Sequence, residues 1–394
     1  MACCNHYLFS CAIFILQLAS AWSTRATSEC KDVQFEVTAT AENRIAQQPL
    51  PNAFQNFSSI LDTILNTPVK FQTVSGKYKI YGQYCEPSVK HAKPGLQVLV
   101  HGLTYSHLYW NGFETLPIPR DPTSWVSFAN QQGYATLAID RLGVGNSDRP
   151  DPLQAVQQPL QVEIVHQLIQ LLRGNGDSGK IDLSTAWQNI IYVGHSFGSS
   201  IGTTISAKYP DDVDALILTA VGVGRSSQSQ LLSEYFATHR PAAEADPEQF
   251  AGLDADYVIP TGKKERQNIF YTPRSGTDFD PTKYSKDFVT RQTTTFGESL
   301  GIIFNISTTF NKPVGIFTGQ RDAVTCSLEN PEDPPDCGQG SDDSVAAFKQ
   351  YYPAVPDNKF TSYQQPDAGH SLQIHRTAPF GFMHAHKFLA RQGL

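Results

Sequence analysis

Residues 189–209 read NIIYVGHSFGSSIGTTISAKY, and this stretch decides the fold. Its first five residues form a short apolar run, typical of a strand that is buried on both faces of a sheet. Small residues then continue in a helical pattern that stops before Pro210. Between the two, residues 194–198 read GHSFG, a G-x-S-x-G sequence in a setting where a sharp turn exposes the serine. The stretch therefore predicts an α/β sheet that carries Ser196 as a nucleophile.

Short apolar runs alternate with helical patterns through much of the chain. The runs that we expect to form strands lie at 96–100, 134–139, 189–193, 215–218, 314–317 and 360–363. Helical patterns, such as the one that ends at Gly174, separate them. This alternation predicts an α/β fold with a mostly parallel, doubly wound sheet. Ahead of it, residues 71–85 alternate apolar and polar side chains around Gly76 and Lys77, which predicts an N-terminal antiparallel hairpin.

The alternation stops between residues 222 and 312, where no clear buried strand is visible. Helical patterns at 229–239 and 247–253, and a weaker one at 288–306, predict an inserted helical cap over one end of the sheet. A leader rich in Gln, Asn and Thr precedes the sheet, with one helix expected near 57–65. The predicted segments are a signal peptide at 1–21, the N-terminal leader at 22–70, the first part of the α/β core at 71–221, the cap at 222–312 and the second part of the core at 313–394.

A serine hydroxyl needs a base to attack a carbonyl near neutral pH. Because the acid and then the base follow the nucleophile in chain order on such a sheet, His370 is the predicted base. It comes directly after the last expected strand. The alternatives are His375, His384 and His386, which lie on the C-terminal helical stretch, where we expect packed or solvated side chains.

The partner of the base should be a carboxylate that follows a strand between Ser196 and His370. Asp322 is the first carboxylate after the run at 314–317, and it is the predicted acid. Its role would be to hold the imidazole in one tautomer and to stabilise the imidazolium. Asp367 stands only three residues before His370, and a residue that near usually shapes the turn instead.

Acyl transfer also needs N–H donors for the oxyanion. One predicted donor is the backbone N–H of Phe197, directly after the nucleophile. The other is that of Leu103, in the loop after the first parallel strand, where Gly102 permits a sharp turn. His101 in the same loop is expected to be a structural residue. The loop and the turn after Ser196 together predict an oxyanion hole.

Aromatic side chains are the candidates for a substrate-binding wall. Three of them follow the predicted oxyanion loop: Tyr105, Tyr109 and Trp110. The cap holds more, which could line an apolar pocket but which we expect mostly to form the core of the cap: Tyr235, Phe236, Phe250, Tyr257, Phe270 and Tyr271. The expected partner is accordingly an apolar small molecule.

Other classes of site are not expected. Residues 140–147 read DRLGVGNS, but a G-x-G without a further glycine or a P-loop lysine favours a structural turn over a phosphate cradle. No grouping of His, Cys, Asp or Glu has the spacing of metal ligands, so we expect no metal and no cofactor. The net charge of −7 comes without a basic stripe, and nucleic acid is therefore not an expected partner.

The N-terminal residues resemble a secretory signal. Residues 7–19 form an apolar run that is short for a bilayer span, and Ala19-Ser20-Ala21 matches a signal-peptidase site. No Lys or Arg precedes the run, so a membrane anchor stays the alternative, as does later cleavage near Ala26. We expect a secreted protein without a further membrane span. Sequons at Asn56 and Asn305 could carry N-glycans on this route.

Cysteine usage fits an oxidising compartment. Four cysteines remain after cleavage: Cys30, Cys85, Cys326 and Cys337. An even number suggests two disulfides, and three pairings are possible. We favour pairing the first with the second and the third with the fourth, because each pair joins neighbours in the predicted layout.

Taken together, the motifs resemble the α/β-hydrolase-1 family. The matching motifs are HGLT, DRLGVGNSD, GHSFG, GQRD and GHSL, each after a predicted strand. The resemblance covers residues 71–394, and 222–312 is where that family inserts its variable cap. It implies the fold and the serine triad but not the substrate, since members include esterases, lipases, lactonases, thioesterases, aminopeptidases, acyltransferases and lyases. The signal peptide and the sequons resemble those of secreted eukaryotic members, among which fungal ones often tailor secondary metabolites.

Three functional hypotheses follow from these residues. Hydrolysis of a carboxylic ester or lactone through an acyl-enzyme is the first. Acyl transfer or lyase chemistry on the same triad is the second. A binding module without catalysis is the third, although such proteins usually lose a triad member and none is lost here. Epoxide hydrolases and haloalkane dehalogenases look similar but carry Asp at the elbow, so Ser196 argues against both.

Overall fold

The computed structural model describes residues 29–45, 69–89, 95–175, 186–223, 230–273, 276–300, 302–326 and 335–394. The predicted signal peptide, the helix expected near 57–65 and the sequon at Asn56 lie outside these ranges. In the part of the chain that is described, no helix combines the length and the apolar character that crossing a membrane requires.

An eight-stranded sheet forms the centre of the molecule, with the strand order β1-β2-β4-β3-β5-β6-β10-β11. Its strands are β1 (Cys30–Arg44), β2 (Phe71–Cys85), β3 (Gly95–Val100), β4 (Ala135–Ile139), β5 (Asn189–His195), β6 (Ala215–Thr219), β10 (Val314–Gly319) and β11 (Phe360–Gln365). Neighbours from β4 to β11 are parallel, whereas β2 runs antiparallel to both β1 and β4. The predicted sheet, mostly parallel with an antiparallel N-terminal pair, is confirmed.

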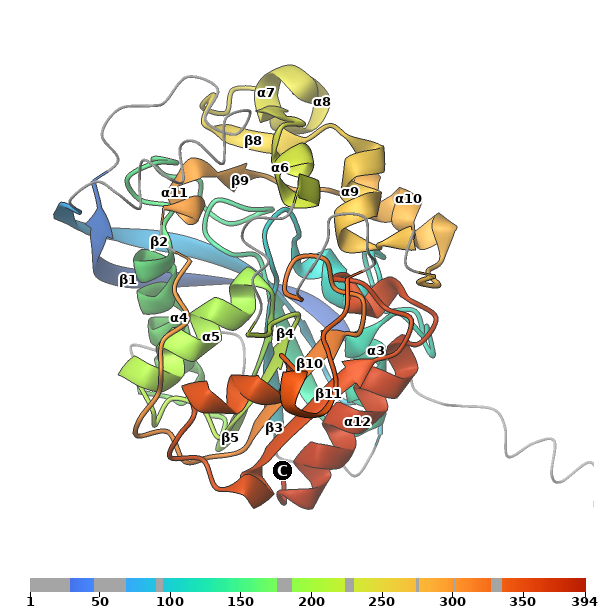
Figure 1. Cartoon of the computed structure of the whole chain (residues 1–394). Helices are drawn as coiled ribbons and strands as arrows, with labels where there is room; N and C mark the ends of the chain where they lie inside the picture. The colour runs from blue at the N-terminus through green and yellow to red at the C-terminus, as the bar shows by residue number, and fades with distance from the viewer. Residues whose placement is uncertain are drawn as a thin grey trace, which may run out of the picture.

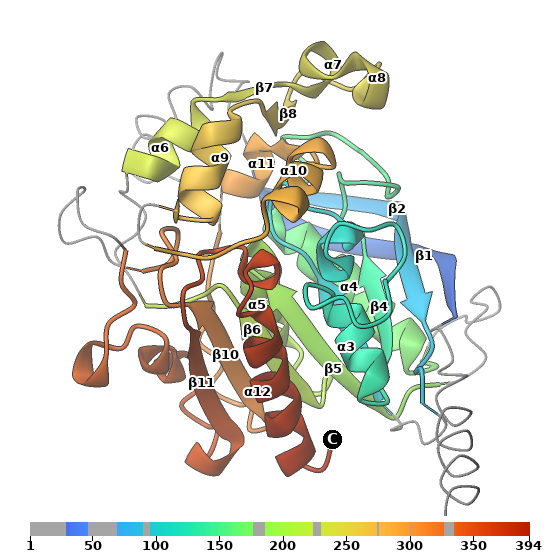
Figure 2. The same cartoon turned by 90° about the vertical axis from the view of Figure 1, so that its right-hand side faces the viewer.

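Helices cover both faces of this sheet (Figures 1 and 2). One face carries α4 (Gln158–Leu172) and α5 (Phe197–Lys208), and the other carries α3 (Trp125–Gln131) and α12 (Ala378–Arg391). Short 3-10 turns lie in the connections: η2 (His107–Asn111), η5 (Gly340–Asp342), η6 (Ala346–Tyr351), η7 (Asp357–Lys359) and η8 (Leu372–Ile374). Val98 and Val100 of β3 pack into the apolar core on the first face, and Leu99 packs into the core on the second. Because neither face of the central strands meets water, β3, β4, β6 and β10 are buried along their whole length.

The antiparallel pair is built differently from the predicted hairpin. β2 runs unbroken through Gly76 and Lys77, and its partner is β1, with Cys30 opposite Cys85. The expected turn at Gly76 is therefore wrong, and the segment predicted as a leader contains a strand of the sheet. A period-two pattern marks that strand, since every second side chain is apolar and buried: Phe35, Val37, Ala39 and Ala41.

The cap combines helices with a small sheet. Its helices are α6 (Gln230–Phe236), α7 (Ala242–Ala245), α8 (Pro247–Phe250), α9 (Lys263–Phe270), α10 (Pro281–Val289) and α11 (Phe296–Ser299). Its sheet is antiparallel, in the order β7-β8-β9, from β7 (His239–Pro241), β8 (Tyr257–Pro260) and β9 (Thr294–Thr295). β8 is buried, so the expectation of no buried strand is wrong. In Figure 1 the cap lies above the α/β core.

The helix expected at 288–306 does not form as one element, because the described part of that range holds only the end of α10 and the short α11. The helix α10 ends at Val289, and the chain then becomes extended through three consecutive threonines, 293–295. Threonine is stiff at its branched Cβ and favours extended backbone over helix. Thr295 then caps α11, because its side chain accepts from the N–H of Glu298 while the Glu298 side chain accepts from the N–H of Thr295.

Two disulfides join the cysteines in the pairing favoured from the sequence. Cys30 is bonded to Cys85 across β1 and β2, with 4.1 Å between their Cα atoms. Cys326 is bonded to Cys337, with 4.7 Å between Cα atoms, in the connection that follows β10. The first ties the N-terminal strand to the sheet, and the second closes a loop near one of the predicted triad residues.

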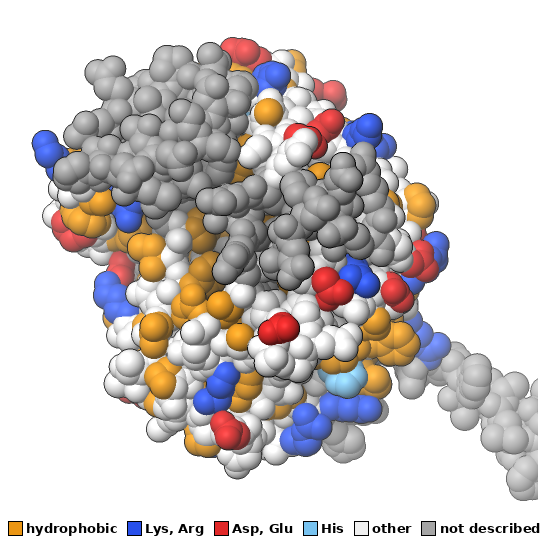
Figure 3. All heavy atoms as spheres, viewed as in Figure 1, with side chains coloured by type: hydrophobic (Ala, Val, Ile, Leu, Met, Phe, Trp, Pro, Cys, Tyr) orange, Lys and Arg blue, Asp and Glu red, His pale blue; other side chains and the backbone are white. Residues whose placement is uncertain are grey.

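The surface visible in Figure 3 mixes charges of both signs, and Lys and Arg form no stripe on that face. A shallow groove of about 450 Å³ lies between β1, α4, α5 and the chain at Ile303. Asn305 of the second sequon lines this groove and is half-buried. Ser307 of the same sequon is fully buried, and its hydroxyl donates to the carbonyl oxygen of Ser206 over 2.7 Å.

Candidate active site

Ser196 stands in the turn between β5 and α5 with a left-handed φ of 53°. Its N–H donates to the carbonyl oxygen of Thr219 over 2.9 Å, which ties the turn to β6. The motif's glycines are required by close approach. A Cβ on Gly198 would lie 2.0 Å from the carbonyl oxygen of Val100, and one on Gly194 would lie 2.7 Å from that of Gly198. The tight turn therefore holds the serine, which is half-buried, at the start of α5.

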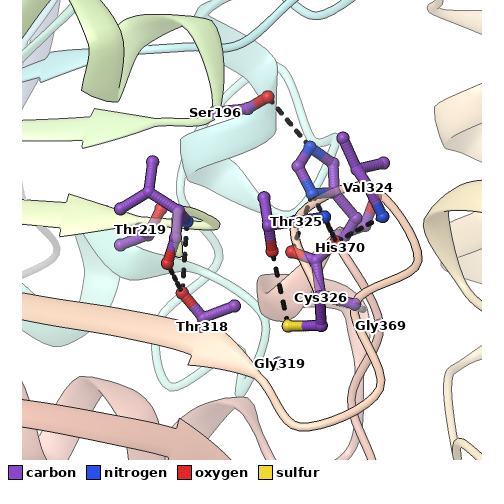
Figure 4. Close-up of polar contacts among 12 residues, drawn as sticks. Ser196, Thr219, Thr318, Gly319, Val324, Thr325, Cys326, Gly369 and His370 are labelled. Atoms are coloured by element: carbon purple, nitrogen blue, oxygen red, sulfur yellow. Dashed lines mark hydrogen bonds and ion pairs between the residues drawn. The ribbon is translucent and has the colours of Figure 1, made fainter. Parts of the chain in front are cut away.

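His370 joins Ser196 to Asp322 through both nitrogens of its ring. Nε2 lies 2.9 Å from Oγ of Ser196 (Figure 4), and Nδ1 lies 2.8 Å from Oδ2 and 3.0 Å from Oδ1 of Asp322. Because an ionised carboxylate only accepts, Nδ1 carries the proton and Nε2 accepts from the serine hydroxyl. The imidazole is 2% exposed and the carboxylate 0%. The three predicted residues thus form one continuous chain of hydrogen bonds.

Asp322 is fixed by the loop that follows β10. Its Oδ1 accepts from the backbone N–H groups of Val324 over 2.8 Å and Thr325 over 3.0 Å. Its own carbonyl oxygen accepts from the N–H of Cys326 over 3.0 Å. The disulfide to Cys337 therefore begins one turn beyond the carboxylate, in direct contact with the loop that aims it at the imidazole.

The rival residues are engaged elsewhere. Asp367 turns the chain with a φ of 51°, and its carbonyl oxygen accepts from Asp278. Nε2 of His375 accepts from the N–H of Gly369 over 3.0 Å, and burial lowers the pKa of this histidine to about 4. His384 and His386 lie on α12. The ring of His384 stacks on that of Tyr363, with 4.1 Å between centroids, and Nε2 of His386 lies 3.1 Å from Nε2 of Gln97.

The loop after β3 lies directly beside the nucleophile, since a Cβ on Gly102 would be 3.0 Å from Cβ of Ser196. His101 is structural: Nδ1 donates to the carbonyl oxygen of Gly102, and Nε2 accepts from the N–H of Arg141. Burial and the nearby Arg141 charge lower its pKa to about 3, so it is neutral. Within the described residues, the N–H groups of Leu103 and Phe197 have no acceptor. These are the two donors predicted for an oxyanion.

The sequence pattern that defines the alpha/beta hydrolase fold family matches residues 98–376. The chain belongs to this family. The matched stretch contains the β3 loop, the turn at Ser196, the cap, Asp322 and His370.

Two curated relatives match over part of their length. Epoxide hydrolase 3 of Xenopus tropicalis is 29% identical over 102 residues, which are 25% of this chain and 24% of that protein. Proline iminopeptidase of Chitinophaga pinensis is 25% identical over 174 residues, which are 44% of this chain and 50% of that protein. The chain thus spans between a quarter and half of these relatives. Among solved structures, a thermophilic esterase from Thermogutta terrifontis is similar with 14% identity and a TM-score of 0.49, over 80% of this chain and 95% of that one.

The aromatic candidates for a substrate wall of this α/β hydrolase are all buried. Tyr109 and Trp110 of η2 are 0% exposed and lie in the core. Tyr105 is nearer to the chemistry: its ring centroid lies 5.8 Å from that of Phe270, which lies 5.3 Å from the imidazole of His370. A substrate role for the three stays a prediction. Phe270 of α9, which we grouped with the cap core, is the aromatic residue that the cap places against the base.

Two buried arginines that the sequence analysis did not single out connect the cap of this hydrolase to the loop after β3. Arg266 of α9 pairs with Asp287 of α10, and its Nη1 donates to Oγ1 of Thr104 over 2.7 Å. Arg141, which follows β4, pairs with Glu298 of α11. No local motif marks these pairs, because their partners stand 21 and 157 residues apart in the sequence.

The turn at 140–147, which the sequence predicts to be structural, is packed around one carboxylate. Asp140 fills it: Oδ2 accepts from the N–H of Asn146 over 2.9 Å, and a Cβ on Gly145 would lie 2.0 Å from that oxygen. Burial favours the neutral acid, but hydrogen bonds from His107 hold the pKa of Asp140 below its ordinary value. A buried carboxylate at this place repels a phosphate. Across the described ranges, no group of three or more His, Cys, Asp or Glu could hold a metal ion.

Proposed function

We propose that this protein is a secreted serine hydrolase that cleaves a carboxylic ester or a lactone through an acyl-enzyme. The observation that carries the proposal is the hydrogen-bond chain from Ser196 through His370 to Asp322. An extracellular setting is supported by the apolar N-terminal run and by the two disulfides, which persist in oxidising compartments.

The geometry supports the following sequence of bond changes. Oγ of Ser196 bonds to the ester carbonyl carbon while Nε2 of His370 takes the serine proton. The imidazolium is stabilised by Asp322 and gives its proton to the departing alkoxide as the carbon–oxygen bond breaks. Water then attacks the acyl-enzyme, passes a proton to Nε2, and the acid leaves as the proton returns to Ser196.

The oxyanion of both tetrahedral intermediates would lie between the N–H groups of Leu103 and Phe197. Phe197 is the first residue of α5, so its N–H also belongs to the positive end of a helix dipole. Donors that are already aimed at the developing charge cost no reorganisation during the reaction. Buried backbone N–H groups are normally hydrogen-bonded, whereas those of Leu103 and Phe197 have no acceptor among the described residues.

The surroundings of the triad support an apolar acyl or alcohol group. Phe270 and Tyr105 lie on the base side, and Leu103 is half-buried beside Ser196. The nearby cations do not offer a site for an anionic group, because Arg266 and Arg141 are buried and already paired, with Asp287 and Glu298 respectively. We therefore infer an uncharged, apolar ester.

Epoxide opening does not fit the nucleophile. A carboxylate that opens an epoxide forms an ester, which water can hydrolyse, whereas Ser196 would form an ether that this triad has no means to cleave. Cleavage at an amino terminus is also less favoured, since an ammonium group needs a buried anion beside the scissile bond. The buried cap carboxylates near the loop, Asp287 and Glu298, are already neutralised by Arg266 and Arg141.

A panel of nitrophenyl esters, aryl esters and lactones tests the proposal. We expect an initial burst of alcohol equal to the enzyme concentration, followed by turnover that varies with acyl chain length. Added alcohols or amines separate hydrolysis from acyl transfer: the free acid should remain the main product. Absence of turnover on the whole panel, or an ester of the added alcohol as the main product, would contradict ester hydrolysis as the function.

A further inference from the structure

Arg141 contacts both backbone segments that carry the predicted oxyanion donors. Its Nε donates to the carbonyl oxygen of His101 over 3.0 Å, and its Nη2 donates to that of Gly102 over 3.2 Å. Its guanidinium also lies over the ring of Phe197, 4.7 Å from the centroid. One buried side chain thus touches the residues just before Leu103 and the residue just after Ser196. Its position bears on both donors at once.

The counterion of this arginine comes from the cap. Nη1 of Arg141 bonds to Oε1 of Glu298, and both side chains are 1% exposed. The other oxygen of Glu298 accepts from Oγ1 of Thr294 over 2.9 Å and from the N–H of Thr295 over 3.2 Å. Gln161 of α4 bonds to both members of the pair, over 2.6 Å to Arg141 and 3.1 Å to Glu298. Each oxygen of the carboxylate therefore has two hydrogen-bond partners.

We propose that Glu298 is a positioning residue of the cap, which sets the oxyanion hole through Arg141. This inference rests on the proposed function, since it assigns work to the donors of that reaction. A buried guanidinium without its anion moves toward water or other acceptors. Such a movement releases the carbonyl oxygens of His101 and Gly102, and the N–H of Leu103 shifts with them. The cap then does more than cover the site, because it completes it.

A second cap contact holds the other side of the loop. The backbone N–H of Gln292, between α10 and β9, donates to the carbonyl oxygen of Thr104 over 3.0 Å. Arg266 donates a hydrogen bond to the hydroxyl of Thr104. Thr104 itself has a left-handed φ of 61°. Leu103 therefore lies between two anchors that both lead into the cap.

The test compares Glu298→Gln with a control that loosens the cap elsewhere. Lys283 of α10, whose side chain is 13% exposed, bonds to Glu114 over 2.9 Å and to Asp121 over 2.5 Å, in the core beyond η2. Lys283→Met thus breaks a cap–core ion pair without touching the β3 loop. Glu298→Asp keeps the negative charge on a side chain that is one methylene shorter. This variant replaces Glu298→Gln in the test if Glu298→Gln does not fold.

The readouts separate transition-state from ground-state binding. For Glu298→Gln we expect kcat to fall about tenfold to a hundredfold with KM within about twofold. A trifluoromethyl ketone analogue of the ester forms a tetrahedral adduct on Ser196, and its affinity for the variant should fall by the same factor as kcat. The matching ether, which has no carbonyl, should bind unchanged. Glu298→Asp should show a smaller loss of the same pattern, and Lys283→Met should retain kcat.

Several outcomes overturn the inference while the proposed function stands. In each of them the wild type cleaves the ester. Glu298→Gln keeps the full kcat, or its loss is confined to KM or to binding of the ether. Alternatively, kcat falls equally in Lys283→Met. A wild type that cleaves no ester and takes no fluorophosphonate on Ser196 instead overturns the proposed function, and the inference with it.

Discussion

Both carboxylate oxygens of Asp322 lie within 3.0 Å of Nδ1 of His370. An amide in place of the carboxylate presents a donor to that nitrogen and favours the wrong tautomer. Asp322→Asn should therefore lower kcat about 10⁴-fold on an activated ester, with little change in KM. Asp367→Asn is the matched control, since asparagine tolerates a left-handed φ and the side chain holds no triad member. Equal losses in the two variants would contradict the assignment of the acid.

The turn at Ser196 depends on the absence of a side chain at Gly198. A Cβ there would lie 2.0 Å from the carbonyl oxygen of Val100, which belongs to the neighbouring strand and cannot move freely. We expect Gly198→Ala to lower the free energy of unfolding by about 3 kcal/mol or more and to reduce kcat. Gly95→Ala is the control, because its Cβ would meet Tyr134 at an ordinary 3.4 Å. Urea unfolding of both variants gives the comparison, and a stable, fully active Gly198→Ala would refute the packing argument.

Buried histidines should make the fold sensitive to acid. Burial lowers the pKa of His101 and of His239 to about 3 and that of His375 to about 4. In the unfolded chain each binds a proton near pH 6.5. Between about pH 6.5 and 4 the unfolded state therefore binds more protons, so stability falls as the pH falls through this window. Each histidine contributes a slope of about 1.4 kcal/mol per pH unit.

His239→Gln tests this slope away from the triad. The ring of His239 lies in the cap, where Nδ1 donates to the carbonyl oxygens of Tyr235 and Phe236. The free energy of unfolding, measured at several pH values, should depend on pH less steeply than in the wild type. The difference in slope should correspond to about one proton fewer taken up on unfolding. An unchanged dependence would show that this histidine is not kept neutral by the fold. Ester turnover at pH 7 should be retained.

The triad could be predicted from the sequence because its signals are local. Ser196 is marked by its glycines, and Asp322 and His370 each follow a strand whose apolar run is visible. The prediction of a hairpin within 71–85 was wrong because Gly76 and Lys77 resemble a turn. The true partner of β2 is β1, which is distant in the sequence, so no local pattern indicates the pairing. The alternation of apolar and polar residues in β1 is visible in the sequence and is itself a signal for a strand at 35–41.

The cap contacts could not be predicted in the same way. The strand β8 is a four-residue run, and its partner β9 has two residues, too short for a periodic signal. Arg141 looked like part of a turn, and nothing near it in the sequence indicates a partner 157 residues away. Charge pairs of this kind depend on the folded geometry, which is why the positioning role emerged only from the structure.

The most direct test of the central claim is covalent labelling of Ser196. A fluorophosphonate should add one equivalent to the native enzyme, and peptide mass spectrometry should locate it on the serine of the GHSFG stretch, residues 194–198. Ser196→Ala should take no label and should lose ester turnover by about 10⁶-fold. Label on another residue, or near-normal turnover in Ser196→Ala, would contradict the account.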